Sequence, residues 1–213
     1  MRYLILFTIL LFPNLAADGR EVFNKNFQGV VLIITDDGIG SGAIITEAGH
    51  VLTNAHVIND NAQVEVYIFA DDEIDNLRHS AKVLKVDKSK DLALLKIANS
   101  KFKLNPIKIS IVEPRVGEEA HAIGHPDGEI WSYTKGYISQ IRDDYEWEYD
   151  ANSKMRATVL QMQTPINPGN SGGPLLNEHG NLIGINSFGD KELQSINFAV
   201  GVEEIIKFLG SGR

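Results

Sequence analysis

Short apolar segments separated by turn residues run along most of the chain. The apolar, β-branched segment 29–35 is followed by the turn residues Asp36-Asp37-Gly38, and this alternation of strand and turn signals continues to about residue 200. Further strands are predicted at 43–46, 50–53, 64–70, 81–86, 92–97, 107–109, 121–123, 136–141, 159–163, 174–176, 182–187 and 197–200. About a dozen short strands exceed what one small closed barrel uses, so the pattern predicts an all-β fold of two packed barrels.

The two ends of the chain depart from the strand pattern. Residues 202–209 have helical spacing, which predicts a short C-terminal helix with one apolar face. Residues 18–28 are polar apart from Phe23 and Phe27, and are expected to form an N-terminal arm or a short helix.

Residues 1–17 resemble a cleaved secretory signal peptide. They combine Arg2, an apolar run of about ten residues, the helix breaker Pro13 and the small pair Ala16-Ala17. The run falls short of the ~20 residues that span a bilayer, so an uncleaved anchor is the weaker alternative. The sequence contains no Cys, so no disulfide is available. These features favour an exported bacterial protein, periplasmic or secreted.

Composition narrows the class of protein without fixing its function. A hydrophobic fraction of 43% in 213 residues is enough for a substantial core. The formal net charge of −8, with no long basic run, argues against a general nucleic-acid binder.

The segment 167–174, Asn-Pro-Gly-Asn-Ser-Gly-Gly-Pro, is called here the serine turn. A serine between glycines, with prolines on both sides, suits a tight turn rather than a helix or a plain strand. Such a turn can present Ser171 as a nucleophile and the N–H groups of Gly169 and Ser171 to a developing oxyanion. The alternative is a hairpin turn with an ordinary hydroxyl.

A serine nucleophile needs a base, usually a His held by a carboxylate. His56 directly follows an apolar strand, where its ring can be both fixed and accessible, and the remaining five His are interpreted as structural. Asp91 stands at the head of the apolar strand 92–97, where a partly buried carboxylate requires a partner such as an imidazole N–H. Asp87 is the competing acid, interpreted as a solvent-facing turn residue.

Gly169-Asn170-Ser171-Gly172-Gly173 also fits the nucleophile elbow of α/β-hydrolases. That fold places an acid and then a base after the serine, and it alternates helices with parallel strands. Only His179 follows Ser171, eight residues later, and the alternating helices are missing from the pattern. This alternative is therefore rejected.

Several motifs in order resemble the chymotrypsin-like serine proteases, and within them the HtrA/Deg branch of trypsin-like peptidases. The motifs are Gly40-Ser41-Gly42, the segments 52–57, 91–96 and 122–124, the segment 166–175, and the segment 182–186. The resemblance covers residues 29–209 and implies two six-stranded Greek-key barrels, at about 29–110 and 111–200 within a protease domain 29–213. It also implies His56 as base, Asp91 as its orienter and Ser171 as nucleophile, with an oxyanion hole at Gly169, Asn170 and Ser171 and with no metal or cofactor.

Departures from the family pattern carry information. Asn170 stands where digestive enzymes of the superfamily have an Asp that pairs with a new N-terminus, so activation by N-terminal cleavage is not expected. No PDZ domain is expected, because only four residues follow Leu209. Phe23 and Phe27 are candidates for the trimer contacts of this branch, and homo-oligomer formation stays open.

The resemblance also locates a substrate pocket. Pro165, six residues before Ser171, stands where an acidic residue would select Lys or Arg, so an apolar pocket for aliphatic side chains is expected. The other substrate-contacting positions carried over from the family are Ile166, Ser187, Phe188, Gly189 and Asn197.

The segment 142–156 interleaves acidic residues with Tyr145, Trp147 and Tyr149. A solvated acidic hairpin is the favoured interpretation, and a loop that recruits cationic substrates is the alternative. For the whole chain, the expected function is a serine endopeptidase acting on exported or unfolded polypeptides. The alternative is a chaperone-like polypeptide-binding protein whose oxyanion hole is inactive at rest.

Overall fold

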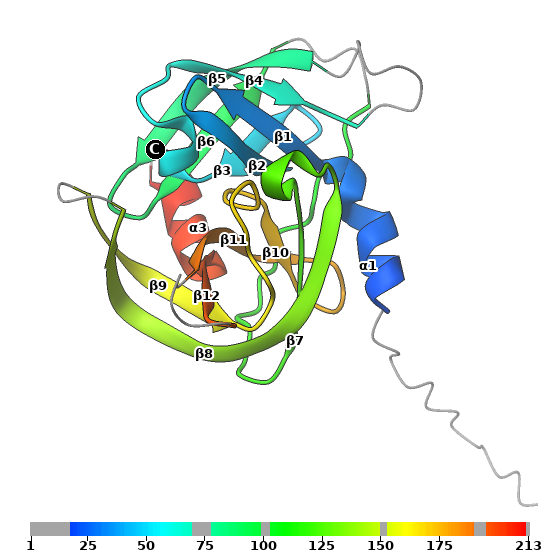
Figure 1. Ribbon diagram of the computed structural model, residues 1–213, viewed down its shortest axis with the longest axis vertical. Helices are drawn as coiled ribbons and strands as arrows, with labels where there is room; N and C mark the ends of the chain where they lie inside the picture. The colour runs from blue at the N-terminus through cyan, green and yellow to red at the C-terminus, as the bar shows by residue number, and fades with distance from the viewer. Residues whose placement is uncertain (1–17, 70–77, 99–102, 150–152, 190–194, 212–213) are drawn as a thin grey trace, which may run out of the picture.

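The computed structural model describes residues 18–69, 78–98, 103–149, 153–189 and 195–211, and shows two β-barrels packed side by side (Figure 1). The expected signal peptide, residues 1–17, lies outside the described residues. Among the helices of the described ranges, none is long and apolar enough to cross a membrane.

The first barrel is closed by six antiparallel strands in the order β1-β2-β3-β6-β5-β4. The strands are β1 (Val30–Thr35), β2 (Gly38–Ile44), β3 (His50–Thr53), β4 (Gln63–Tyr67), β5 (Arg78–Asp87) and β6 (Leu92–Ile97). Alternate residues point into the barrel, where Ile33, Val66 and Leu95 belong to one buried apolar cluster. The predicted alternation therefore encloses a core rather than covering a flat sheet.

The second barrel repeats this strand order, as β7-β8-β9-β12-β11-β10. Its strands are β7 (Glu119–Gly124), β8 (Ser132–Glu148), β9 (Lys154–Met162), β10 (Pro174–Leu176), β11 (Leu182–Gly189) and β12 (Asn197–Gly201). All neighbouring strands are antiparallel. The prediction of two packed six-stranded barrels with a short C-terminal helix is confirmed.

In the described ranges the barrels are accompanied by the α-helices α1 (Gly19–Asn26), α2 (Ala55–Ile58) and α3 (Val202–Gly210). Asp18 caps α1 by accepting a hydrogen bond from the N–H of Glu21. α3 packs against β11 and β12, and its Glu204 forms an ion pair of 3.4 Å with Lys90 near the start of β6. The C-terminal helix thus ties the second barrel to the first, as Figure 1 shows.

The space between the barrels holds the largest apolar cluster. Leu52 and Leu92 of the first barrel belong to the same cluster as Ile123 and Leu176 of the second, and all four are fully buried. The barrels are therefore one packed unit, and loops that face each other across their junction are held in fixed relative positions.

One prediction about the strands is wrong. Residues 107–109 form no strand, because both barrels close without them; Ile109 makes only an isolated bridge to Leu182. The segment 142–156, predicted as a solvated acidic hairpin, is described on either side of its tip, where β8 and β9 pair with their acids exposed, but Trp147 is buried. The division of the chain near residue 110 stays a prediction, with β6 ending at Ile97 and β7 beginning at Glu119.

Candidate active site

His56 and Asp91 are neighbours because the strands that carry them pair. β3 ends at Thr53, which pairs with Ala93 of β6, so the residues just after β3 and just before β6 lie side by side. The His56 Nδ1 atom lies 3.0 and 2.9 Å from the two carboxylate oxygens of Asp91. A carboxylate only accepts, so Nδ1 carries a proton, and in the neutral ring Nε2, on the opposite side of the imidazole, is the acceptor.

Asp91 is a buried carboxylate, 2% exposed, with its acceptor capacity filled. Its oxygens accept from the His56 backbone N–H at 3.0 Å and from the Ser187 hydroxyl at 2.6 Å, besides the imidazole. The Tyr149 hydroxyl lies 3.4 Å from Oδ2. Several donors around one buried charge offset its desolvation and fix the orientation of the His56 ring.

Ser171 lies in the serine turn, which the second barrel presents toward the junction. Gly169 and Gly172 have φ angles of 97° and 84°, which a residue with a side chain adopts only under strain. Within the described chain, the Ser171 hydroxyl makes one hydrogen bond, donated to the carbonyl of Ser187 at 3.0 Å rather than to His56. The three predicted catalytic residues therefore meet at one junction, with the nucleophile–base hydrogen bond not made in this structure.

Two backbone N–H groups of the serine turn are left available to a ligand. The carbonyl of Pro168 accepts a hydrogen bond of 2.9 Å from the N–H of Asp127, and all described peptide bonds are trans. In a trans peptide the N–H points opposite to the carbonyl, so the N–H of Gly169 points away from Asp127. Among the described residues, the N–H groups of Gly169 and Ser171 have no protein acceptor. The Asn170 side chain is buried behind them.

The predicted substrate-contacting residues divide into two groups. Ser187 is buried against Asp91, and Phe188 stacks on Phe198 with ring centroids 4.6 Å apart, so its ring belongs to the core. Asn197 and Gly189 lie together, since a Cβ placed on Gly189 would be 2.5 Å from the Asn197 side-chain oxygen.

That same Cβ would be 3.8 Å from the carbonyl of Ile166, so Ile166 borders the region of Gly189 and Asn197. Pro165 is exposed and its carbonyl accepts from the Thr134 hydroxyl at 2.9 Å. Ile166, Gly189 and Asn197 are thus brought close together, whereas Pro165 is exposed to solvent.

A cleft of about 240 Å³ borders two of the three predicted catalytic residues. Its lining includes His56, Gly169 and Ser171, together with Asp37 of the β1–β2 turn and Ile39 of β2. The predicted base and the predicted nucleophile therefore face a single solvent-accessible space that both barrels border.

Tyr149 is a site residue that the sequence did not single out. It comes from the end of β8, and its ring lies over the His56 imidazole with centroids 4.2 Å apart. Its hydroxyl is 2.9 Å from the carbonyl of Ser187 and 3.0 Å from that residue's hydroxyl. The interleaved aromatic residues of 142–156 were the only sequence signal, and nothing in them indicated which one reaches the site.

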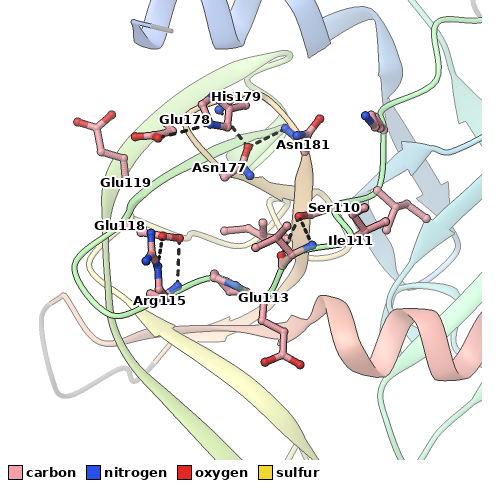
Figure 2. Close-up of a pocket in the computed structure, with 15 residues that line it drawn as sticks. Ser110, Ile111, Glu113, Arg115, Glu118, Glu119, Asn177, Glu178, His179 and Asn181 are labelled. Atoms are coloured by element: carbon pink, nitrogen blue, oxygen red, sulfur yellow. Dashed lines mark hydrogen bonds and ion pairs between the residues drawn. The ribbon is translucent and has the colours of Figure 1, made fainter. Parts of the chain in front are cut away.

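A second cavity, of about 250 Å³, lies away from this junction (Figure 2). It is bordered by the connection between the barrels and by the β10–β11 turn, and its polar side chains bond to one another, as in the pair Arg115–Glu118 at 2.7 Å. None of His56, Asp91 and Ser171 lines it. Among the described residues, no group of three His, Asp or Glu side chains is arranged to hold a metal ion.

The fold and the junction define the class of two-barrel serine peptidases. Residues 40–185 match the trypsin-like peptidase domain family, and the chain belongs to that family of serine endopeptidases. Its relatives include Protease Do-like 1, chloroplastic, of Arabidopsis thaliana, 40% identical over 151 residues that cover 70% of this chain and 33% of the relative.

Other similar proteins belong to the same HtrA/Deg group. Serine protease HTRA1 of Xenopus tropicalis is 37% identical over 80% of this chain and 35% of its own length. The serine endoprotease from Yersinia pestis superposes with a TM-score of 0.74 at 29% identity, covering 92% of this chain and 66% of that one. Deg5 superposes with a TM-score of 0.73 at 30% identity, covering 87% and 89%. The chain thus spans about a third of the length of the first two relatives.

Proposed function

We propose that this chain is a serine endopeptidase that hydrolyses peptide bonds through an acyl-enzyme, with His56, Asp91 and Ser171 as its catalytic residues. The observation that carries the proposal is the clamped imidazole: Nδ1 is held by Asp91 at 2.9 and 3.0 Å, and the ring borders the same cleft as Ser171. This arrangement leaves Nε2 free to take a proton.

The reaction follows from these positions. Ser171 Oγ attacks the substrate carbonyl and gives its proton to His56 Nε2, while Asp91 stabilises the imidazolium that forms. The N–H groups of Gly169 and Ser171 donate to the oxyanion of the tetrahedral intermediate. His56 then protonates the leaving amine, and a water activated by the same ring hydrolyses the acyl-enzyme.

The Ser171 hydroxyl must first leave the carbonyl of Ser187. Rotation about the Ser171 Cα–Cβ bond replaces this 3.0 Å hydrogen bond by one to His56. Nucleophile–base hydrogen bonds are often made only once substrate is bound. The observed rotamer also favours the second candidate function, a chaperone-like protein that binds polypeptides without cleaving them.

Three further parts of the proposal concern the context of the reaction. The pocket bordered by Ile166, Gly189 and Asn197 would take small or medium aliphatic side chains, because no described wall carries a charge there. The substrates would be exported or unfolded polypeptides, since the resemblance to a signal peptide at 1–17 implies export to the periplasm or secretion in a bacterium. Phe23 and Phe27, the candidates for contacts between copies, pack on each other within the chain with ring centroids 5.1 Å apart. A homo-oligomer through these residues therefore stays a proposal.

Replacing Ser171 by Ala tests the proposal directly. The wild-type protein is expected to hydrolyse casein and to be labelled by a fluorophosphonate, and Ser171→Ala is expected to do neither. Ser110→Ala, which removes another buried serine hydroxyl far from the cleft, is the matched control and is expected to keep both activities. Binding of unfolded chains with equal affinity by wild type and Ser171→Ala, with no labelling of either, would instead support the chaperone-like function.

A further inference from the structure

A buried serine–histidine pair lies directly behind the serine turn. Ser41 is on β2 of the first barrel and His125 follows β7 of the second, and both are fully buried. The Ser41 Oγ atom lies 2.7 Å from the carbonyl oxygen of Gly169, 3.0 Å from His125 Nδ1 and 3.1 Å from the His125 backbone nitrogen. The proposed reaction uses neither side chain.

The contacts fix where the protons lie. A carbonyl only accepts, so the 2.7 Å contact requires the Ser41 hydroxyl to donate to Gly169. The two remaining contacts then both donate to Ser41 Oγ, from the backbone N–H and from Nδ1–H of His125. His125 therefore carries a proton on Nδ1. Its Nε2 is buried with no partner among the described residues, and this burial favours the neutral ring.

This pair holds peptide units next to those of the oxyanion donors. The Ser41 side chain holds the carbonyl of Gly169, in the unit between the two that carry the N–H groups of Gly169 and Ser171. The Ser41 backbone N–H donates to the carbonyl of Ser171 at 2.8 Å, in the unit that follows them. Two residues after His125, Asp127 holds the carbonyl of Pro168 at 2.9 Å. Three carbonyls of the serine turn are therefore tied, and their peptide planes cannot turn without breaking buried hydrogen bonds.

The backbone of His125 also leaves no room for the turn to shift toward it. A Cβ on Gly169 would lie 2.2 Å from the His125 carbonyl oxygen, so the serine turn rests on this segment. The contact requires glycine at 169, whose φ of 97° is strained for other residues.

We propose that Ser41 and His125 are positioning residues for the reaction: they hold the serine turn so that the N–H groups of Gly169 and Ser171 point into the cleft. This inference rests on the proposed function, because it concerns the oxyanion hole of that reaction. It also gives a role to the Gly40-Ser41-Gly42 motif, whose serine reaches from the first barrel to the nucleophile turn of the second.

Three substitutions separate this role from general packing. Ser41→Ala removes the donor to Gly169, and His125→Phe keeps a ring while removing Nδ1–H. His125→Asn retains an amide N–H near the position of Nδ1 and is the conservative rescue. The matched controls are Ser110→Ala and His121→Phe; His121 is an equally buried histidine of β7 whose Nδ1 contacts the Tyr133 hydroxyl, away from the serine turn.

The measurement is of kcat and KM on a fluorogenic peptide with an aliphatic residue at the cleaved bond. These values separate an effect on the transition state from an effect on substrate binding. Ser41→Ala and His125→Phe are expected to lower kcat by about 10- to 100-fold with KM within about twofold, somewhat less than the 10²–10³-fold typical of losing an oxyanion donor itself. Affinity for the matching peptidyl trifluoromethyl ketone, which forms a tetrahedral oxyanion, should fall by the same factor as kcat/KM. Affinity for the peptide amide should not change.

His125→Asn is expected to stay within about threefold of wild type, and the two controls to match wild type in kcat. A kcat equal to wild type in folded Ser41→Ala and His125→Phe overturns the inference, as does a rise in KM at constant kcat. Should one of these two fail to fold, the other decides by the same criteria. If Ser171→Ala is inactive while Ser41→Ala and His125→Phe are as active as wild type, the positioning role alone is refuted. If the wild-type protein is itself inactive, the proposed function is refuted.

Discussion

Tyr149 contributes to the catalytic junction through both ends of its side chain. The ring covers His56, with 42% of the residue exposed at its outer edge, and the hydroxyl is enclosed between Asp91 and Ser187. Burial, together with the negative charge of Asp91, raises the pKa of the Tyr149 phenol far above its ordinary value. The phenol therefore stays a neutral hydrogen-bond donor across the physiological pH range.

Separating the ring from the hydroxyl gives a prediction. Tyr149→Phe keeps the ring contact with His56 and is expected to lower kcat about 3- to 10-fold, through loss of the hydrogen bond that the phenol donates to the Ser187 carbonyl. Tyr149→Ala also uncovers the His56 ring, and a drop of about 10- to 100-fold is expected. Steady-state kinetics on the fluorogenic peptide measures both. Tyr137→Phe, on the same strand and exposed, is the control; equal kcat values for Tyr149→Ala and wild type would exclude a role for the ring.

Among single residues, the meeting of the three proposed catalytic residues at one junction could be predicted from sequence, because each lies beside a recognisable strand. His56 follows β3, Asp91 precedes β6, and the glycines and prolines around Ser171 mark its turn. Tyr149 and His125 could not be assigned in this way. Tyr149 is 58 residues from Asp91 in the chain, and only the path of the folded hairpin brings their side chains together.

At the scale of elements, the β8–β9 hairpin adds a buried aromatic face to the predicted acidic hairpin. Its aromatic residues stack in series, with Trp147 on Phe188 at 5.0 Å and Tyr145 on Phe198 at 5.0 Å. Its acids stay on the outer face, where Asp144 pairs with Arg156 at 3.3 Å across the hairpin. The alternation of acids and aromatics is therefore the period-two pattern of a strand with one face in the core.

The two faces of the hairpin should respond differently to substitution. Trp147→Ala is expected to cost about 3 to 5 kcal/mol of unfolding free energy, as for a buried aromatic residue, and to lower kcat by withdrawing Tyr149. Glu146→Gln, on the exposed face, is expected to change stability by less than about 0.5 kcal/mol. Urea unfolding followed by far-UV circular dichroism, which does not depend on the tryptophan signal, measures both changes in unfolding free energy. Equal costs for the two variants would contradict this description of the hairpin.

The same variant tests whether the hairpin recruits cationic substrates. If the acids attracted substrate through space, Glu146→Gln would lower kcat/KM most at low salt. Because the hairpin acid Asp144 already pairs with Arg156, no such salt-dependent loss is expected. A salt-dependent decrease in kcat/KM would restore the recruiting loop as the better interpretation.

The sequence predicted where most strands occur. It did not predict how long they are or which apolar segments only connect the barrels. The apolar alternation located β1, β6 and β10 closely, because their ends coincide with turn residues. The apolar segment 107–109 resembles a strand, yet it connects two barrels that are already closed. It makes one backbone hydrogen bond to each barrel. Closure of a barrel depends on all six strands together and leaves no mark in a short window of sequence.

At the scale of the whole molecule, burial of neutral histidines makes folding depend on pH. Burial lowers the pKa of His125 to about 4 and also lowers the pKa of His121, which is fully buried in β7. In the unfolded chain these groups titrate near ~6.5, so between about pH 6.5 and pH 4 the unfolded state binds more protons than the folded state. Stability is therefore expected to fall as the pH decreases through this window.

For His125 the loss approaches about 3 kcal/mol at pH 4, since each pKa unit corresponds to ~1.4 kcal/mol. Chemical unfolding of wild type and His125→Asn at pH 7 and pH 4.5 measures the contribution. The difference in stability between the two pH values should be smaller in His125→Asn, while the His121 contribution remains in both. An identical pH dependence in the two proteins would show that His125 is not the buried neutral group described here.

The shared strand order of the two barrels has a consequence for how such a site can arise. Each barrel closes on its own six strands, so the loops at the junction are not needed for closure. The first barrel carries His56 just after its third strand and Asp91 just before its sixth, whereas the second carries Ser171 in the turn before its fourth strand. In the proposed reaction, one barrel therefore supplies the base and the other the nucleophile. Each barrel could vary its other loops without removing the residue that its partner provides.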